Sequence, residues 1–171
     1  MTVAVETGLW QVDPAASAVT LRHKTFWGLV TVKGTFAAVA GQGEVRPDGS
    51  ATGTVTLGAA SLDTKNAKRD AHLRAADFFD ADNHPEITFT VQGAELRDGD
   101  TAQVTGQLTV RGISRPQTVA ARLVEAGADG LTLEAEFTVD REQFGLGWNQ
   151  LGMIRGLTTV TTTLRFTRTP A

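Results

Sequence analysis

Hydrophobic and polar side chains alternate with a period of two along most of this 171-residue chain. In residues 17–24, for example, one face carries Val19, Leu21 and His23, and the other carries Ala18, Thr20, Arg22 and Lys24. This period is typical of half-buried β-strands. Comparable runs occupy residues 28–46, 51–59, 86–97, 101–111, 116–125, 131–139 and 157–167. The pattern therefore predicts about eight long strands.

Tight turns join most of the predicted strands. Residues 47–50, 97–100 and 127–130 each combine Gly with Asp, and the first also contains Pro, which are the residues that tight turns prefer. Short connections favour an antiparallel meander, and an even number of strands lets the first strand pair with the last. The sequence lacks the alternation of strands and helices that would indicate a parallel sheet. We therefore expect one domain over residues 1–171, an extended eight-stranded antiparallel β-barrel in the all-β class.

One region departs from the strand pattern. Residues 60–85 have helical composition, and Asp63 or Thr64 can cap a helix around residues 63–75. That helix is rich in charged side chains, which favours a solvated lid that packs through its alanines and one leucine. The other interpretation is a polar rim over an apolar cavity. An eight-stranded barrel either fills its interior with side chains or holds one small ligand, and the pattern does not choose between the two.

Composition narrows the function classes. The formal net charge is −3, and Lys and Arg are scattered, so no basic patch for nucleic acid is visible. The absence of Cys excludes disulfides, thiolate metal sites and Cys nucleophiles. No stretch approaches the ~20 apolar residues of a transmembrane helix. With Met1 as the native start and no signal segment, we expect a cytoplasmic protein; removal of a leader would make it periplasmic or secreted.

The polar segment offers weak candidates for catalysis. Asp70 and His72 could form an acid–base pair, but their spacing points them about 200° apart on a helix. His23, His72 and His84 could converge on zinc, although lone histidines more often have structural roles. No nucleophile elbow and no phosphate-binding glycine loop is visible. We expect no catalytic residues, no metal and no cofactor, and keep a hydrolase or isomerase using Asp70 and His72 as the alternative.

Several ordered motifs resemble one known family. The first motif is Trp-Gln-Val-Asp-Pro at residues 10–14. Ser-Leu-Asp-Thr-Lys-Asn at 61–66 then precedes Arg-Asp-Ala-His-Leu-Arg at 69–74 and Asp-Phe-Phe-Asp at 77–80. Pro-Glu-Ile-Thr-Phe at 85–89, a glycine-flanked run at 104–112 and Phe-Gly-Leu with Trp-Asn in 144–149 follow in order. Together these motifs resemble the YceI-like, polyisoprenoid-binding family of lipocalin-like barrels, from about Trp10 to Thr169. Residues 150–156 depart from the commoner form of the family.

The resemblance implies a hydrophobic pore that binds a long isoprenoid chain, such as a polyprenyl lipid or a quinone tail, for carriage or storage in a bacterial cell. His23, Arg69, Asp70, His72 and Asn149 would then contact a head group. The full set of expected ligand contacts is Val19, Leu21, His23, Phe26, Val30, Val32, Asn66, Arg69, Asp70, His72, Phe78, Phe79, Phe89, Phe137, Phe144, Trp148 and Asn149. The competing hypothesis is a filled barrel that acts through partners. A homodimer is compatible with either.

Overall fold

The computed structural model describes residues 7–25, 30–47, 50–74, 80–96, 100–127, 130–140 and 158–168. At residues 24, 25, 30–32, 69, 72, 73 and 96 the description covers the backbone alone. The described strands are β1 (Gly8–Val12), β2 (Ala18–Thr25), β3 (Val30–Phe36), β4 (Val39–Val45), β5 (Ala51–Gly58), β6 (Leu62–Asp63), β7 (Glu86–Leu96), β8 (Thr101–Val110), β9 (Ile113–Ala126), β10 (Gly130–Val139) and β11 (Thr158–Arg168). One α-helix, α1 (Ala67–Arg74), and the short 3-10 turns η1 (Pro14–Ala16) and η3 (Ala59–Ser61) complete the described elements.

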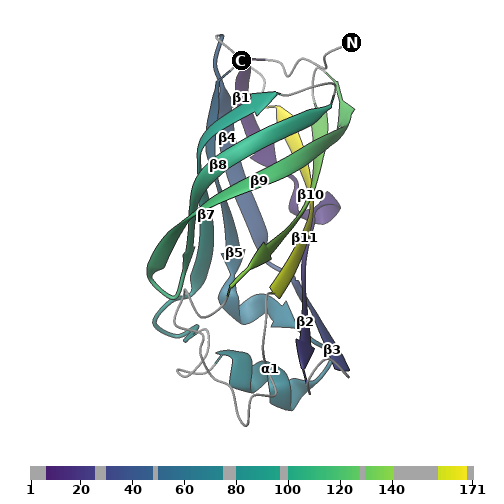
Figure 1. Cartoon of the computed structure of the whole chain (residues 1–171), viewed down its shortest axis with the longest axis vertical. Coiled ribbons are helices and arrows are strands. Elements are labelled where there is room, and N and C mark those ends of the chain that lie inside the picture. The colour runs from purple at the N-terminus through teal and green to yellow at the C-terminus, as the bar shows by residue number, and fades with distance from the viewer. Residues whose placement is uncertain are drawn as a thin grey trace.

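The sheet closes on itself as an antiparallel barrel. Its ring runs β1–β4–β5–β7–β8–β9–β10–β11, and β11 pairs back onto β1. Figure 1 shows an elongated barrel with β1 toward one end and α1 near the other. We call these the upper and the lower end. The predicted eight-stranded antiparallel barrel is confirmed, because β2 and β3 continue β1 and β4 toward the lower end.

The bend between β1 and β2 is built by the Asp13-Pro14 motif. Pro14 opens η1, where its fixed φ suits the first turn, and Asp13 Oδ1 accepts a hydrogen bond from Ala15 N at 3.1 Å. Ser17 Oγ donates to Asp13 O at 2.7 Å and accepts from Arg165 N at 2.9 Å. The hydroxyl thereby ties the interrupted strand to β11, so that β1 and β2 act as one bent strand along the same neighbour.

Residues 28–46 are expected to be a strand pair or one bent strand with a bend at Gly34. The structure has one bent strand, but its break lies at Ala37 and Ala38, between β3 and β4. Ser61 holds that break, because its Oγ accepts from Ala38 N at 3.0 Å and its carbonyl accepts from Ala37 N. Gly34 instead continues the regular register opposite Leu21. A Cβ at Gly34 would lie 2.7 Å from Leu62 Cδ1, so glycine is required there for close packing.

The helix is shorter than predicted. It begins at Ala67 rather than at residue 63, because Leu62 and Asp63 form β6 against β3. Asp63 Oδ1 then accepts a hydrogen bond from Lys65 N at 2.8 Å, and Lys65 has a positive φ of 64°. An Asp side chain that binds the backbone two residues on makes a turn. The chain therefore turns once between the strand and α1, and Asp63 serves that turn rather than the helix.

The outward faces of the strands are polar. Arg122 Nη2 lies 2.9 Å from Glu134 Oε1 across β9 and β10, and Arg22 Nη2 lies 3.6 Å from Glu136 Oε2. The inward faces carry the hydrophobic core, which includes buried Val12, Val19 and Val160. Within the described residues, no helix has the length and apolar character needed to cross a membrane.

Candidate functional site

The strand register identifies the side chains that face the barrel interior. Phe137 is paired with Val160, which is paired with Leu21, so these three residues form one row across β10, β11 and β2. Because paired residues point to the same side of a sheet, the whole row faces inward with buried Val160. The same reasoning applies to the pair of Leu57 and Ile87 and to the row of Val55, Phe89 and Leu108. These residues therefore also face inward.

Many of these inward side chains are only half-buried. Leu21, Leu57, Phe89, Phe137 and Leu164 have intermediate exposure, although they pack against the buried core. Water reaches an inward side chain of a closed barrel only through an internal space or an opening in its wall. Water therefore reaches apolar side chains on the inward face, and a mostly apolar lining is the character expected of a ligand pocket.

The upper end of the interior is filled. Trp10 is 3% exposed and forms a cluster with buried Leu123 and Leu131. Half-buried Val45, Leu133 and Phe166 pack against this cluster. Trp10 is paired with Gly43 of β4, whose lack of a side chain leaves room on the inward face beside the indole. The barrel is therefore closed by packing at the upper end.

The wall opens toward the lower end, between β9 and β10. The pairing of these two strands runs from Ala126 opposite Leu131 to Ala121 opposite Ala135, and it ends there. Residues 113–120 of β9 and 136–139 of β10 continue without pairing to one another. Figure 1 shows the two strands diverging below their paired segment. We call this unpaired stretch of the two strands the β9–β10 seam, because no backbone pairing closes the barrel wall between them there.

Several inward side chains near the lower end and the seam are polar. His23 Nδ1 lies 2.9 Å from Thr158 Oγ1, which joins β2 to β11. On β9, half-buried Gln117 and exposed Arg115 are paired with Gly106 and Leu108, so they continue the inward face along the seam. Hydroxyl, imidazole and amide groups can orient a ligand head group without a charge of fixed sign. The lower edge of the interior thus offers polar groups to a ligand.

The structure brings together part of the predicted ligand set. Val19, Leu21, His23, Phe89 and Phe137 all face inward, Val19 being fully buried and the others half-buried. Val30 and Val32 lie in β3 with their Cα atoms opposite Thr25 and His23, and their side chains lie outside the description. The remaining aromatic and amide candidates lie outside the described residues: Phe26, Phe78, Phe79, Phe144, Trp148 and Asn149.

The polar helix contributes a structural contact. Asp70 is 6% exposed, and its Oδ1 accepts hydrogen bonds from Thr64 N at 2.9 Å and from Thr64 Oγ1 at 2.5 Å. Both donors come from the turn that precedes α1, so this carboxylate holds the helix against β6. Asn66 lies exposed just before α1. Arg69 and His72 lie within α1, but their side chains are outside the description.

Three contributors to the site carry no sequence signal of their own. Thr158 contacts His23 across 135 residues of sequence, and threonine is more common on the outward face of β11 than on the inward face. Gln117 lies at an inward position, although a polar residue in the sequence gives no reason to expect it there. Trp10 belongs to the opening motif, but only its packing with Leu123 and Leu131 identifies it as the upper closure.

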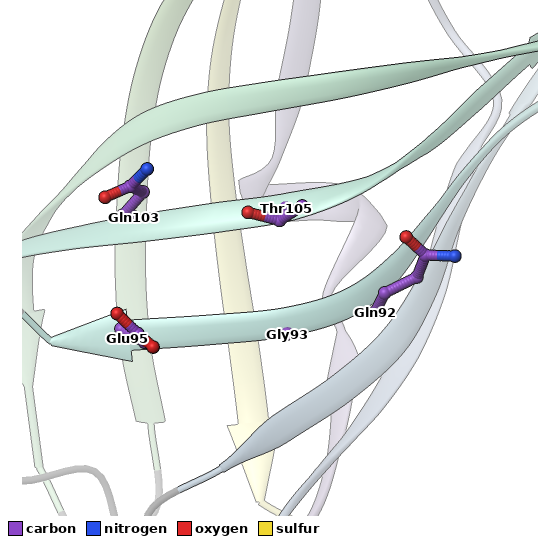
Figure 2. A pocket seen from close by; sticks show the side chains of 5 residues that line it. All are labelled: Gln92, Gly93, Glu95, Gln103 and Thr105. Carbon is purple, nitrogen blue, oxygen red and sulfur yellow. The ribbon is translucent and has the colours of Figure 1, made fainter.

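A second depression lies on the outer face of the barrel. It has a volume of about 430 Å³ and is lined by Gln92, Gly93, Glu95, Gln103 and Thr105. Figure 2 shows these residues along β7 and β8. The register shifts between Val91 and Gly93, and this β-bulge leaves exposed Gln92 as an extra residue on β7. The depression is open and polar, and it is separated from the interior by the sheet itself.

Metal and acid–base chemistry find little support among the described residues. No three of their His, Asp or Glu side chains are close enough to hold a metal ion. His84 lies at the lower end, where its Nε2 is 4.0 Å from Asp80 Oδ2 and its ring packs against Gly112 in the turn between β8 and β9. His23 lies inside the barrel with Thr158. The two histidines thus have separate surroundings.

Comparisons with known proteins place the chain by sequence. Residues 10–167 match the family model described as the YceI-like domain. The protein YceI of Shigella flexneri is 43% identical over 75 residues, which cover 44% of this chain and 39% of that protein. The match thus spans about two fifths of the length of the curated relative. The family resemblance expected from the motifs is confirmed.

Two solved structures share the fold. BcnA of Burkholderia cenocepacia superposes with a TM-score of 0.81 at 23% identity, covering 90% of this chain and 98% of the other. A polyisoprenoid-binding domain of Saccharophagus degradans, implicated in plant cell wall breakdown, has a TM-score of 0.75 at 14% identity, covering 96% of this chain and all of that domain (100%). At these identities the likeness establishes the barrel and its topology.

Proposed function

This chain belongs to the YceI-like domain family, and we propose that it binds a long isoprenoid chain, such as a polyprenyl lipid or a quinone tail, inside its barrel. The observation that carries the proposal is the row of inward apolar side chains that remain half-buried, among them Leu21, Phe89 and Phe137. The fold shared with a polyisoprenoid-binding domain adds support. The protein serves carriage or storage of that lipid and not its chemical conversion.

Apolar burial supplies the affinity in this proposal. Each buried methylene contributes ~0.8 kcal/mol of transfer free energy, so several isoprene units bind well without any charged contact. Loss of ligand and side-chain freedom offsets a large part of that gain. A flexible chain gains most from a preformed interior, because a preformed wall costs little further ordering. The closed ring of hydrogen-bonded strands provides such a wall.

The polar lower edge gives the ligand a direction. A tail that avoids His23, Thr158 and Gln117 extends upward toward the Trp10 cluster, and its head group stays near the seam. Hydrogen bonds from these side chains then orient the head group, as a few placed polar groups do in mostly apolar pockets. Exposed Arg115 lies one inward position further along the seam.

A hydrolase or isomerase using Asp70 and His72 has less to support it. Oδ1 of Asp70 is held by two hydrogen bonds from Thr64, and the carboxylate is buried against β6. A general base needs a free path to the proton that it abstracts. We therefore assign Asp70 to the structure of the α1 turn.

Extraction of the purified protein provides the direct test. We expect organic extraction followed by mass spectrometry to release a lipid with an isoprenoid chain, and we expect the delipidated protein to bind an added polyprenol or a long-tailed quinone in a calorimetric titration. Empty extracts together with no heat of binding for either probe would overturn the proposal.

A pair of bulky substitutions locates the binding site. Phe89 faces inward and Thr90, its neighbour on β7, is exposed. Phe89→Trp adds volume to the interior and should weaken polyprenol binding at least ~10-fold, whereas Thr90→Trp adds the same ring outside the barrel and should leave it unchanged. Circular dichroism and thermal melting check that both variants fold. Equal affinities for the two folded variants would place the lipid outside the barrel.

A further inference from the structure

Trp10 occupies a special place along the barrel axis. It is the largest side chain of the upper cluster, it is 3% exposed, and its neighbours Leu123 and Leu131 are also buried. Below it, Leu133 and Phe166 are half-buried and pack against that same cluster. Phe166 also packs against the main core. Trp10 therefore lies at the upper end of the inward face, above these half-buried side chains.

The other end of the accessible interior is marked by the polar edge. Thr158 of β11 contacts His23 there, and Phe166 on the same strand lies at the Trp10 cluster. Eight residues at ~3.3 Å each separate them, which is about 26 Å along the strand. Strands of such barrels tilt by about 35–45°, so the axial distance is about 20 Å. The two ends of the interior thus set a finite length.

We propose that Trp10 is the end wall that limits the length of the isoprenoid chain, which makes it a specificity-determining residue. This inference rests on the proposed function, because it assumes that the tail enters from the polar edge. A chain longer than the interior must fold back or leave part of itself in water at the seam. Its additional isoprene units then gain no burial, so affinity stops rising with length once the tail reaches the indole.

A purely structural role for Trp10 makes a different prediction. Removing a buried indole that serves only stability lowers the melting temperature and weakens binding of all chain lengths alike. An end wall changes the rank order of lengths instead. The length at which affinity stops rising is therefore the quantity to measure.

The experiment uses a series of linear all-trans prenols that differ by one isoprene unit, each titrated into the delipidated protein. Trp10→Phe replaces the indole with a smaller ring and so lengthens the interior. Leu133→Trp adds a bulky ring below Trp10 and so shortens the interior, while leaving Trp10 in place. We expect the first to move the affinity plateau to longer prenols and the second to move it to shorter ones, each by about one unit or more. For the prenol one unit beyond the wild-type plateau, Trp10→Phe should bind ~3- to 10-fold more tightly than wild type.

Leu9 supplies the matched control. It precedes Trp10 on β1, points outward and is 56% exposed, so Leu9→Ala should leave the plateau unchanged. A wild-type protein that binds no prenol overturns the proposed function itself. Binding with a plateau that neither Trp10→Phe nor Leu133→Trp moves, in variants folded by circular dichroism, overturns the end wall alone. Because Leu133→Trp acts without removing the indole, a failure of Trp10→Phe to fold leaves the inference testable.

Discussion

His23 and Thr158 meet inside the barrel at 2.9 Å, although 135 residues separate them in sequence. Each residue comes from an end region of the described chain, and the pairing of β2 with β11 brings them together. The contact joins an imidazole ring to a hydroxyl on the inward face near the lower end of the barrel.

Replacing this polar pair should change head-group preference more than tail affinity. His23→Leu with Thr158→Val removes the hydrogen-bonding groups and keeps an apolar wall. We expect the preference of the double variant for a prenol over the hydrocarbon of equal length to fall about fivefold, because one net hydrogen bond contributes about that much to affinity. Calorimetric affinities of both probes measure the ratio. An unchanged ratio would mean that the head group lies elsewhere.

The Thr64–Asp70 contact should contribute to stability rather than binding. Asp70→Ala leaves the Thr64 donors without their acceptor in a buried place, which should lower the free energy of unfolding by about 1–3 kcal/mol. A double-mutant cycle with Thr64→Val, measured by urea denaturation, gives the coupling energy. Lipid affinity of the folded Asp70→Ala protein should remain at the wild-type value. Loss of affinity without loss of stability would return Asp70 to the ligand site.

Gly106 and Gly93 offer a matched test of backbone crowding between β7 and β8. A Cβ at Gly106 would approach Thr90 O at 2.2 Å and Phe89 Cζ at 3.1 Å, whereas a Cβ at Gly93 meets nothing within 4 Å. Gly106→Ala should therefore cost about 1–3 kcal/mol, because the strands must move apart. Gly93→Ala should be neutral or slightly stabilising by less than about 1 kcal/mol. Thermal melts of the two variants compare them directly, and equal melting temperatures would contradict the crowding argument.

The turn before α1 should have a small acid dependence. The backbone hydrogen bond from Lys65 N, helped by the nearby Lys65 and Arg74 charges, lowers the pKa of Asp63 from its ordinary value of 3.8. A lowered pKa means that the ionised form stabilises the fold above pH 3.8, and this contribution is lost as the pH falls through the lower folded value. NMR titration of the Asp63 carboxyl should give a pKa below 3.8. A value at or above 3.8 would show that the Lys65 hydrogen bond is not maintained in solution.

The strand interiors follow the sequence closely, because a period of two fixes which side chains share a face. Leu131, Leu133 and Phe137 share one face as their alternation predicts, and Val55 and Leu57 point inward as expected. The helix begins at Ala67, later than the expected residue 63. The local preference of Asp63 for a cap loses to two tertiary contacts: β6 pairs with β3, and Leu62 packs over Gly34.

Sequence patterning thus determined the eight-stranded antiparallel barrel and which side chains of a strand share a face, because both depend on local periodicity and turn residues. Together with the motifs it also identified the family. It missed the short strands β1 and β6, and it left open which face of each strand lines the interior. Only the tertiary structure shows that side chains such as Phe89 and Leu164 face inward yet stay half-buried. Accessibility depends on how far opposite walls stand apart, and that distance is set by strands remote from one another in sequence.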